Sequence, residues 1–418
     1  MRISSGMIFD SGVASMQKQT ATLLHTQQQV AGGRRMLTPS DDPVAAARVL
    51  DVEQSSSINT QHLENQKAAG ESVNLAETRL VSIGDLIQNV RTLAVQGGNA
   101  PLSGRDRNSI ATELRQRFDE LIGLANSTDS AGQYQFSGFM GSTRPFSGTV
   151  AAGVTYAGDE GQRLMQVSAT RQIPISDSGN DVFMRIRNGN GTFSTAVTAT
   201  NAGSAIIDAG AVLNPAGWSA GNIPATGLKI VFSVVGTTTT YDIQDAATST
   251  SLLTAPLAYV PGQAIPLVKT TAPAADYGAQ VVISGQPANG DSFAIQPSSS
   301  QSLFATLANL ITALETPISA SSGNTLLANR IGAALTNLDQ ASDNILRIRA
   351  SVGARLNELD SLGKAGEDIG LQYQQSLSSL QDVDYAAAIT QLTQQQSYLE
   401  AAQKSFMKVS DLSLFNFV

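Results

Sequence analysis

Few residues of this 418-residue chain have the types and spacing that catalysis requires. Gly217-Trp218-Ser219-Ala220-Gly221 matches a nucleophile elbow, in which a serine sits on a sharp turn between a strand and a helix. Such a serine also needs a histidine later in the chain, whereas His25 and His62, the two histidines, both precede it. Asn222-Ile223-Pro224 follows directly and disfavours the required helix. We therefore interpret the segment as a glycine-bounded loop.

The histidines and the paired carboxylates are weak candidates for a metal or acid–base site. His25 and His62 fall on different predicted helices with no carboxylate or second histidine at ligand spacing, so we expect solvated helix residues. Ser40-Asp41-Asp42 and Asp382-Val383-Asp384 bring carboxylates together, but a metal loop needs more oxygen ligands. They are typical of helix caps and first-turn charges. We predict no catalytic, metal or cofactor site, no cofactor, and no enzyme.

Composition excludes further classes of protein. The chain has no cysteine, which removes disulfides, thiolate zinc sites and cysteine nucleophiles. Its net charge is −8 and its 26 Lys and Arg are scattered, so neither nucleic acid nor an anionic membrane is an expected partner. Only 14% of residues are charged, which suits a surface that packs against copies of itself.

Export by cleavage of a signal peptide is not expected. The first residues, Met1-Arg2-Ile3-Ser4-Ser5-Gly6-Met7-Ile8-Phe9, lack a basic flank followed by an apolar stretch. No run reaches the 18 or so apolar residues that span a membrane. The chain is therefore cytoplasmic, or leaves the cell by a route that reads no cleaved signal.

Three helices are predicted in the N-terminal third. The first carries a 3-4 spacing from Phe9 to Val30, with Thr20 and Gln27 as polar interruptions, and stops at Gly32-Gly33. The second begins after Asp42, a good N-cap that precedes a proline, and ends near Gly97. Ser103 opens the third.

The C-terminal part mirrors this pattern. A 3-4 series runs from Ile331 to Leu362, Gly363 and Gly370 follow, and a last helix covers residues 385–409 with Gln395 in its apolar series. This last helix is the natural partner of the first. The end of the chain, residues 412–418, is apolar to its final residue, which indicates burial in a complex.

These two terminal helices and the tail form the predicted assembly interface. Glutamine within both apolar series favours helices that complete their packing only with neighbouring copies, although a core within one chain is the alternative reading of such a pattern. The interface residues are Phe9, Val13, Met16, Leu23, Val30, Tyr385, Leu392, Leu399, Phe406, Val409, Leu412, Leu414, Phe415 and Phe417.

The middle of the chain reads as β-structure. Polar and apolar side chains alternate over residues 133–136. A β-hairpin is predicted from Val154-Thr155-Tyr156, a turn at 157–161 and a second alternating run over 163–168. Further strands are expected at 228–235, 238–243, 280–284 and 292–296.

We therefore predict an α+β fold with a helical bundle, coiled-coil termini, a β-hairpin and an inserted β-rich outer domain. The expected domains are 1–38 with 380–418, 39–178 with 299–379, and 179–298.

Several segments resemble the flagellin superfamily. They are Met1-Arg2-Ile3-Ser4, residues 32–46 with Pro39-Ser40-Asp41-Asp42-Pro43, residues 392–415, and Tyr156-Ala157-Gly158-Asp159. The similarity is strongest to the branch that forms the hook–filament junction, and covers both helical thirds better than residues 180–297.

The resemblance implies a structural subunit of the bacterial flagellum, exported unfolded by the type III apparatus without a cleaved signal. It implies a ring of copies between hook-associated protein 1 and the flagellin filament, with the terminal helices innermost and the insertion outward. An export chaperone would bind near residues 385–409 and the tail.

Two alternatives stay open. The chain could be a flagellin that forms the filament itself. It could also be a secreted enzyme or glycan-binding module acting through its β-rich insertion, although Trp218, Tyr241 and Tyr259 are the only aromatic residues we single out there for a glycan platform.

Overall fold

The computed structural model describes residues 5–99, 102–129, 131–220, 223–318 and 321–414. The chain divides into two compact units, which are described separately. Unit 1 comprises Met1–Gln66, Val167–Ala169 and Asp360–Val418, and unit 2 comprises Lys67–Gln166 and Thr170–Leu359. No described helix has a stretch long and apolar enough to cross a membrane.

The predicted helix ends in unit 1 are confirmed. Helix α1 (Ser5–Gly32) stops where Gly33 takes a left-handed φ of +67°, which glycine adopts without steric cost. Helix α2 (Pro43–Gly97) starts after Asp42, whose Oδ1 accepts a 3.0 Å hydrogen bond from the Ala45 amide. Gly33 and the Asp42-Pro43 pair therefore set the two ends of the connector, the segment 33–42 between α1 and α2.

Helix α6 (Ser321–Gln381) does not break at its glycines, contrary to our reading of Gly363 and Gly370. The amide group of Asn59 on α2 donates a 2.8 Å hydrogen bond to the Gly366 carbonyl, and a β-carbon there would lie 2.8 Å from Leu63 Cδ2. These glycines lie where α2 comes close, and their lack of a side chain leaves room for Asn59 and Leu63.

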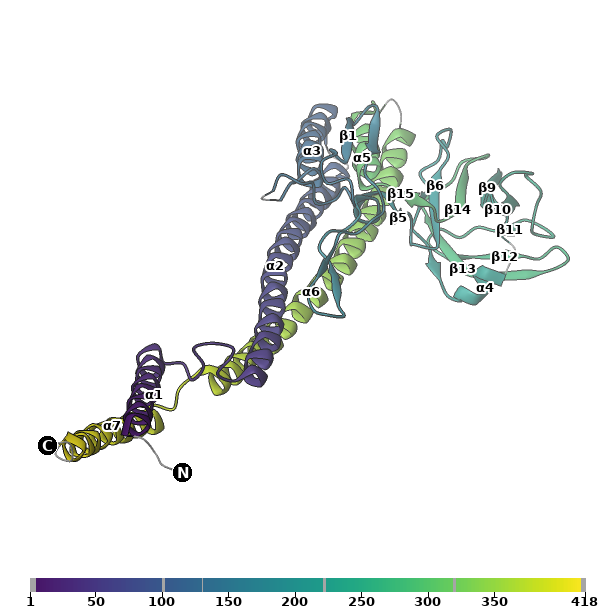
Figure 1. Cartoon of the computed structure of the whole chain (residues 1–418). Coiled ribbons are helices and arrows are strands. Elements are labelled where there is room, and N and C mark those ends of the chain that lie inside the picture. Colours follow the sequence, from purple (N-terminus) through teal and green to yellow (C-terminus); the bar gives the residue numbers. More distant parts are fainter. Residues whose placement is uncertain (1–4, 100–101, 130, 221–222, 319–320, 415–418) are drawn as a thin grey trace. The chain divides into compact units, whose positions relative to one another are not determined.

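Unit 2 has a helical part built on the remainder of α2 and α6. Helix α3 (Gly104–Ala125) opens with a capping box between Ser103 and Asp106 and packs beside α5 (Leu303–Glu315), a helix that sequence reasoning did not separate (Figure 1). Phe118 contacts Phe304 at 6.1 Å between ring centroids. Phe304 also joins a buried cluster with Phe136, Phe146 and Phe183.

The short strands of this part pair differently from our expectation. Strand β1 (Phe146–Thr149) pairs with β2 (Gly153–Tyr156), and β3 (Leu164–Gln166) pairs with β4 (Gln172–Pro174), so no hairpin joins β2 to β3. The Asp159 carboxylate accepts hydrogen bonds from the Phe139 and Gly161 amides, which redirects the chain. Residues 133–136 form turns and an isolated bridge rather than a strand.

The β-rich part of unit 2 contains two main sheets. One has the order β11-β10-β9-β14-β6 and the other β12-β13-β7, with β8 also on β13. The predicted strands at 228–235, 238–243, 280–284 and 292–296 are confirmed as parts of β9, β10, β13 and β14. The elements of this part are η1 (Asn180–Met184), β5 (Ile186–Arg187), β6 (Phe193–Val197), β7 (Ile206–Ile207), β8 (Ala211–Val212), α4 (Pro215–Ala220), β9 (Leu228–Val235), β10 (Thr238–Asp245), β11 (Leu257–Ala258), β12 (Ala264–Lys269), β13 (Ala275–Ser284), β14 (Ser292–Pro297) and β15 (Ser300–Gln301).

One apolar core fills the space between these sheets. Its largest side chains, Phe193, Phe232, Tyr277 and Phe293, are each no more than 1% exposed. The α+β fold class is thus confirmed, whereas the three proposed domain boundaries stay a prediction.

A nearly buried ion pair ties the β3–β4 region to α6. The Asp177 carboxylate accepts two hydrogen bonds from the Arg355 guanidinium, at 2.7 and 3.1 Å, and one from Gln162. The side chains of the pair are 9% and 13% exposed. Removal of one partner would leave the other charge buried and uncompensated.

We predict that Asp177→Ala lowers the free energy of unfolding of unit 2 by about 3 kcal/mol. Urea denaturation, followed by fluorescence of Trp218, measures this change because the only tryptophan lies in unit 2. Asp339→Ala is the matched control within unit 2, since its pair with Arg91 is 53% and 44% exposed and should cost less than about 1 kcal/mol. Equal losses in the two variants would contradict the role given to the buried pair.

Candidate assembly interface

The two ends of the chain form an antiparallel helix pair within unit 1. Helix α7 (Tyr385–Leu414) packs along α1 (Figure 1). The Phe9 and Phe406 rings lie 5.0 Å apart, and at the other end the Tyr385 hydroxyl lies next to Gly33. The C-terminal end of α1 therefore meets the N-terminal end of α7.

The connections at this meeting point are made by backbone groups. The Val383 amide donates to the Gly33 carbonyl (3.0 Å), and the Arg35 amide donates to the Gln381 carbonyl (2.7 Å). The Arg35 guanidinium adds a hydrogen bond to the Leu380 carbonyl. We call these contacts the clasp, because they join the segment after α1 to the segment before α7.

The structure brings most of the predicted interface residues onto the α1–α7 contact. Phe9 and Tyr385 remain 52% and 53% exposed. The half-buried members are Val13, Met16, Leu23, Val30, Leu392, Leu399 and Phe406. Val409, Leu412 and Leu414 belong to α7, and Phe415 and Phe417 lie outside the described residues. The role of this set in assembly stays a prediction.

The polar positions of the contact differ from our reading. Thr20 and Gln27 are exposed, whereas Thr26 is 2% exposed and Gln19 is half-buried. The i+3 and i+4 positions lie on nearly the same face of a helix, and after Met16 and Leu23 the contact takes the i+3 residue rather than the predicted i+4 residue. Gln395 is half-buried, as expected from its place in the series.

This helix pair buries only one side of each helix. Among its described side chains, only Thr26 and Ala388 are buried. Large apolar side chains face solvent elsewhere on both helices, namely Met7, Leu24, Ile389, Tyr398 and Met407. A two-helix contact this narrow gains little from burial, and its exposed apolar faces are typical of a surface that binds a partner.

The connector between α1 and α2 is organised by one carboxylate. Asp41 accepts hydrogen bonds from the Leu37 and Thr38 amides, both at 2.9 Å, and from the Thr38 hydroxyl. These bonds, with those to the Thr38 and Leu37 backbone largest, lower the pKa of Asp41 to about 2. His25 Nε2 lies 3.3 Å from Asp41 Oδ1, so His25 has a carboxylate neighbour that its spacing in the sequence did not predict.

Sequence reasoning missed two hollows. One, of about 430 Å³, lies beside the connector in unit 1 and is lined mainly by apolar side chains, including those of Met36, Leu37, Val49 and Leu50. The folded connector creates it, so no local sequence signal marks it.

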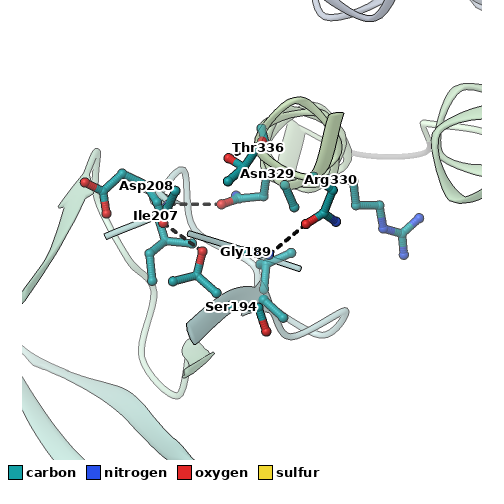
Figure 2. A pocket seen from close by; sticks show the side chains of 14 residues that line it. Gly189, Ser194, Ile207, Asp208, Asn329, Arg330 and Thr336 are labelled. Carbon is teal, nitrogen blue, oxygen red and sulfur yellow. Dashed lines mark hydrogen bonds between the residues drawn. The ribbon is translucent and has the colours of Figure 1, made fainter. Parts of the chain in front are cut away.

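The other hollow, of about 440 Å³, lies in unit 2 between β6–β7 and α6 (Figure 2). Two asparagine side chains of α6 bond backbone amides on the other side of the hollow. Asn329 Oδ1 accepts a hydrogen bond from the Ile207 amide (3.0 Å). Asn337 Oδ1 accepts one from the Gly189 amide (2.8 Å). Asn329 also donates to the Ala205 and Thr325 carbonyls. We interpret these side chains as tethers rather than as ligand groups, because the amide of Asn329 is already fully bonded.

Our interpretation of the elbow-like segment as a loop was wrong, because its described residues 217–220 lie in the short helix α4. The Ser219 hydroxyl donates to the Pro215 carbonyl of the same helix at 3.1 Å. Trp218 stacks on Phe193 at 5.0 Å and so belongs to the core. Among the described residues, no three His, Asp or Glu side chains gather as metal ligands would.

Comparisons with known proteins give one consistent result. Residues 3–140 match the family model of the bacterial flagellin N-terminal helical region. Flagellar hook-associated protein 3 of Escherichia coli is 27% identical over 419 residues, which cover 99% of each chain. Flagellin of Listeria monocytogenes is 24% identical over 129 residues, or 31% of this chain.

Two solved structures from Legionella pneumophila agree with this. A flagellar hook-associated protein 3 has 29% identity and a TM-score of 0.71, and covers 79% of this chain and 98% of its own. A flagellar junction protein has 28% identity and a TM-score of 0.70, and covers 80% and 100%.

We predict that the connector is pH-sensitive only in strong acid. The lowered pKa of Asp41 means that its stabilising effect is complete above the ordinary value of 3.8 and is lost as the pH falls towards about 2. The amide chemical shifts of Leu37 and Thr38 should therefore move with a midpoint near that lower value. Asp41→Asn should shift both amides at all pH values, whereas Asp51→Asn, at an exposed position on α2, should leave them unchanged.

Proposed function

We propose that the chain is a member of the flagellin superfamily, in its hook-associated protein 3 branch, and that it forms the junction between the flagellar hook and the filament. The observation that carries the proposal is the match over 99% of both chains to a hook-associated protein 3. The exposed apolar faces of the α1–α7 pair support a role in assembly.

A filament-forming flagellin is the second candidate. The matches to flagellins favour it less, because the Listeria relative aligns with only 31% of this chain. A flagellin polymerises into long filaments on its own, whereas a junction subunit should not. Electron microscopy of the purified chain at high concentration separates the two functions.

We infer that the partners are other copies of this chain in a ring, hook-associated protein 1 on the hook side and flagellin on the filament side. A cytoplasmic export chaperone would bind α7 and the apolar tail before export. The protein would leave the cell unfolded through the flagellar type III apparatus, without a cleaved signal peptide, and reside outside the cell in the flagellum. The resemblance to the family supports these partners and this route.

We further infer that the chain is a structural protein and not an enzyme. Its relatives are named as parts of the flagellum. The Ser219 hydroxyl, our one candidate nucleophile, is bonded within its own helix turn. Incubation of the chain with a panel of ester substrates tests this inference, and a turnover lost in Ser219→Ala would contradict it.

The first prediction concerns the cell. Deletion of the gene should leave hooks in place but prevent filament attachment, so that unassembled flagellin accumulates in the medium. Electron microscopy of the cells and immunoblots of the medium measure both effects, with the restored gene as control. Normal filaments on the deletion strain would refute the junction function.

The second prediction concerns the interface. Leu399→Asp should abolish incorporation into flagella, because a charge would be placed in the α1–α7 contact without a partner. Gln396→Asp is the control, since Gln396 is exposed on the same helix. Fluorescence of Trp218 should report an unchanged unit 2 in both variants. Wild-type motility of Leu399→Asp would count against the interface.

A further inference from the structure

Two glutamines interrupt the apolar contact between α1 and α7. Gln19 and Gln395 are both half-buried, and the Oε1 atom of each is buried without a hydrogen-bond donor among the described residues. A buried carbonyl oxygen that accepts no bond is costly, so such a pair needs an explanation.

The register of the helices makes these glutamines neighbours. The Phe406 ring contacts Phe9 and lies directly over Gly12. Seven residues after Phe9 and Gly12 on α1 come Met16 and Gln19, and seven residues before Phe406 on α7 comes Leu399. Because the helices are antiparallel, Met16 and Gln19 lie opposite Leu399. The next α7 position in the contact is Gln395, so Gln19 and Gln395 lie in adjacent layers of the same contact.

Each glutamine amide carries both a donor and an acceptor, so two neighbouring amides can satisfy one another after a rotation of their terminal torsions. This match is lost when the helices slide by one heptad so that Gln19 comes near Phe406 and Gln395 comes near Val30. In that slipped register each amide would face aliphatic or aromatic groups that offer it no hydrogen bond.

We propose that Gln19 and Gln395 form a register lock, an amide pair that favours the native alignment of α1 against α7 over this slip. Buried polar pairs specify register in coiled coils at a cost in stability. The lock acts together with the Phe406 ring over Gly12, which also fits the native alignment. The biological purpose of the lock rests on the proposed function. In a ring of copies, every subunit must present the same surface.

The absence of cysteine from the chain permits a direct test by disulfide trapping. Met16→Cys with Ala402→Cys lies one turn inward from the Gly12–Phe406 contact and reports the native register. Leu23→Cys with Ala402→Cys reports a slip of one heptad. Each pair is oxidised in purified full-length protein and the yield of intramolecular disulfide is measured.

With both glutamines present, the native pair should cross-link at least about tenfold more than the slipped pair. In the Gln19→Leu/Gln395→Leu background the preference should fall several-fold, because the amide pair then no longer disfavours the slip. Gln27→Leu/Gln396→Leu, which changes two exposed glutamines on the same helices, should keep the preference. An unchanged preference in the Gln19→Leu/Gln395→Leu background would overturn the lock.

A charge exchange provides a second readout should the leucine variant fold poorly. Gln19→Glu alone should reduce the yield of the native cross-link, and Gln395→Lys added to it should restore that yield if the two side chains meet. Failure of the second change to rescue would also overturn the proposal. Both experiments use purified protein, so their outcome is independent of the deletion phenotype that tests the junction function.

Discussion

The contact that the rest of unit 1 depends on is the clasp between residues 33–35 and 380–383. Two helices from opposite ends of a long chain lose much conformational entropy when they pair, and a long closed segment between them adds to that cost. The Val383–Gly33 and Arg35–Gln381 backbone bonds bring the two segments together at one point. Once the two segments are joined there, α1 and α7 begin side by side, so further pairing of the two helices closes no additional long loop.

The connector supports the clasp from the α2 side. Gly33 turns the chain out of α1, Asp41 bonds the amides that the turn leaves free, and Asp42 caps α2. Each of these residues meets a requirement that follows from helix geometry, since the ends of a helix have no internal hydrogen-bond partners. This explains why a motif of adjacent aspartates and prolines stands between two helices.

Much of the fold could be predicted from the sequence because its signals are local. The ends of α1 and α2 follow from Gly33, Asp42 and Pro43, and the strands β9, β10, β13 and β14 follow from their alternation. The misread features depend on partners far away in the sequence. Gly366 continues a helix because Asn59 and Leu63 approach it, and β2 does not pair with β3 because Asp159 binds Phe139. No pattern within a short window contains that information.

The candidate interface shows the same division. Its apolar positions could be read from the spacing, but the choice of Gln19 over Thr20 depends on which of two neighbouring positions the partner helix α7 covers. The two units also differ in how much apolar surface they bury. The β-rich part of unit 2 has a core of fully buried aromatic side chains, whereas among the described side chains of α1 and α7 only Thr26 and Ala388 are buried. The terminal pair is therefore marginal by itself. The proposed role, in which the chain is exported unfolded and then joins a ring, would benefit from this difference, because the terminal pair would gain most of its stability only when its neighbours are present.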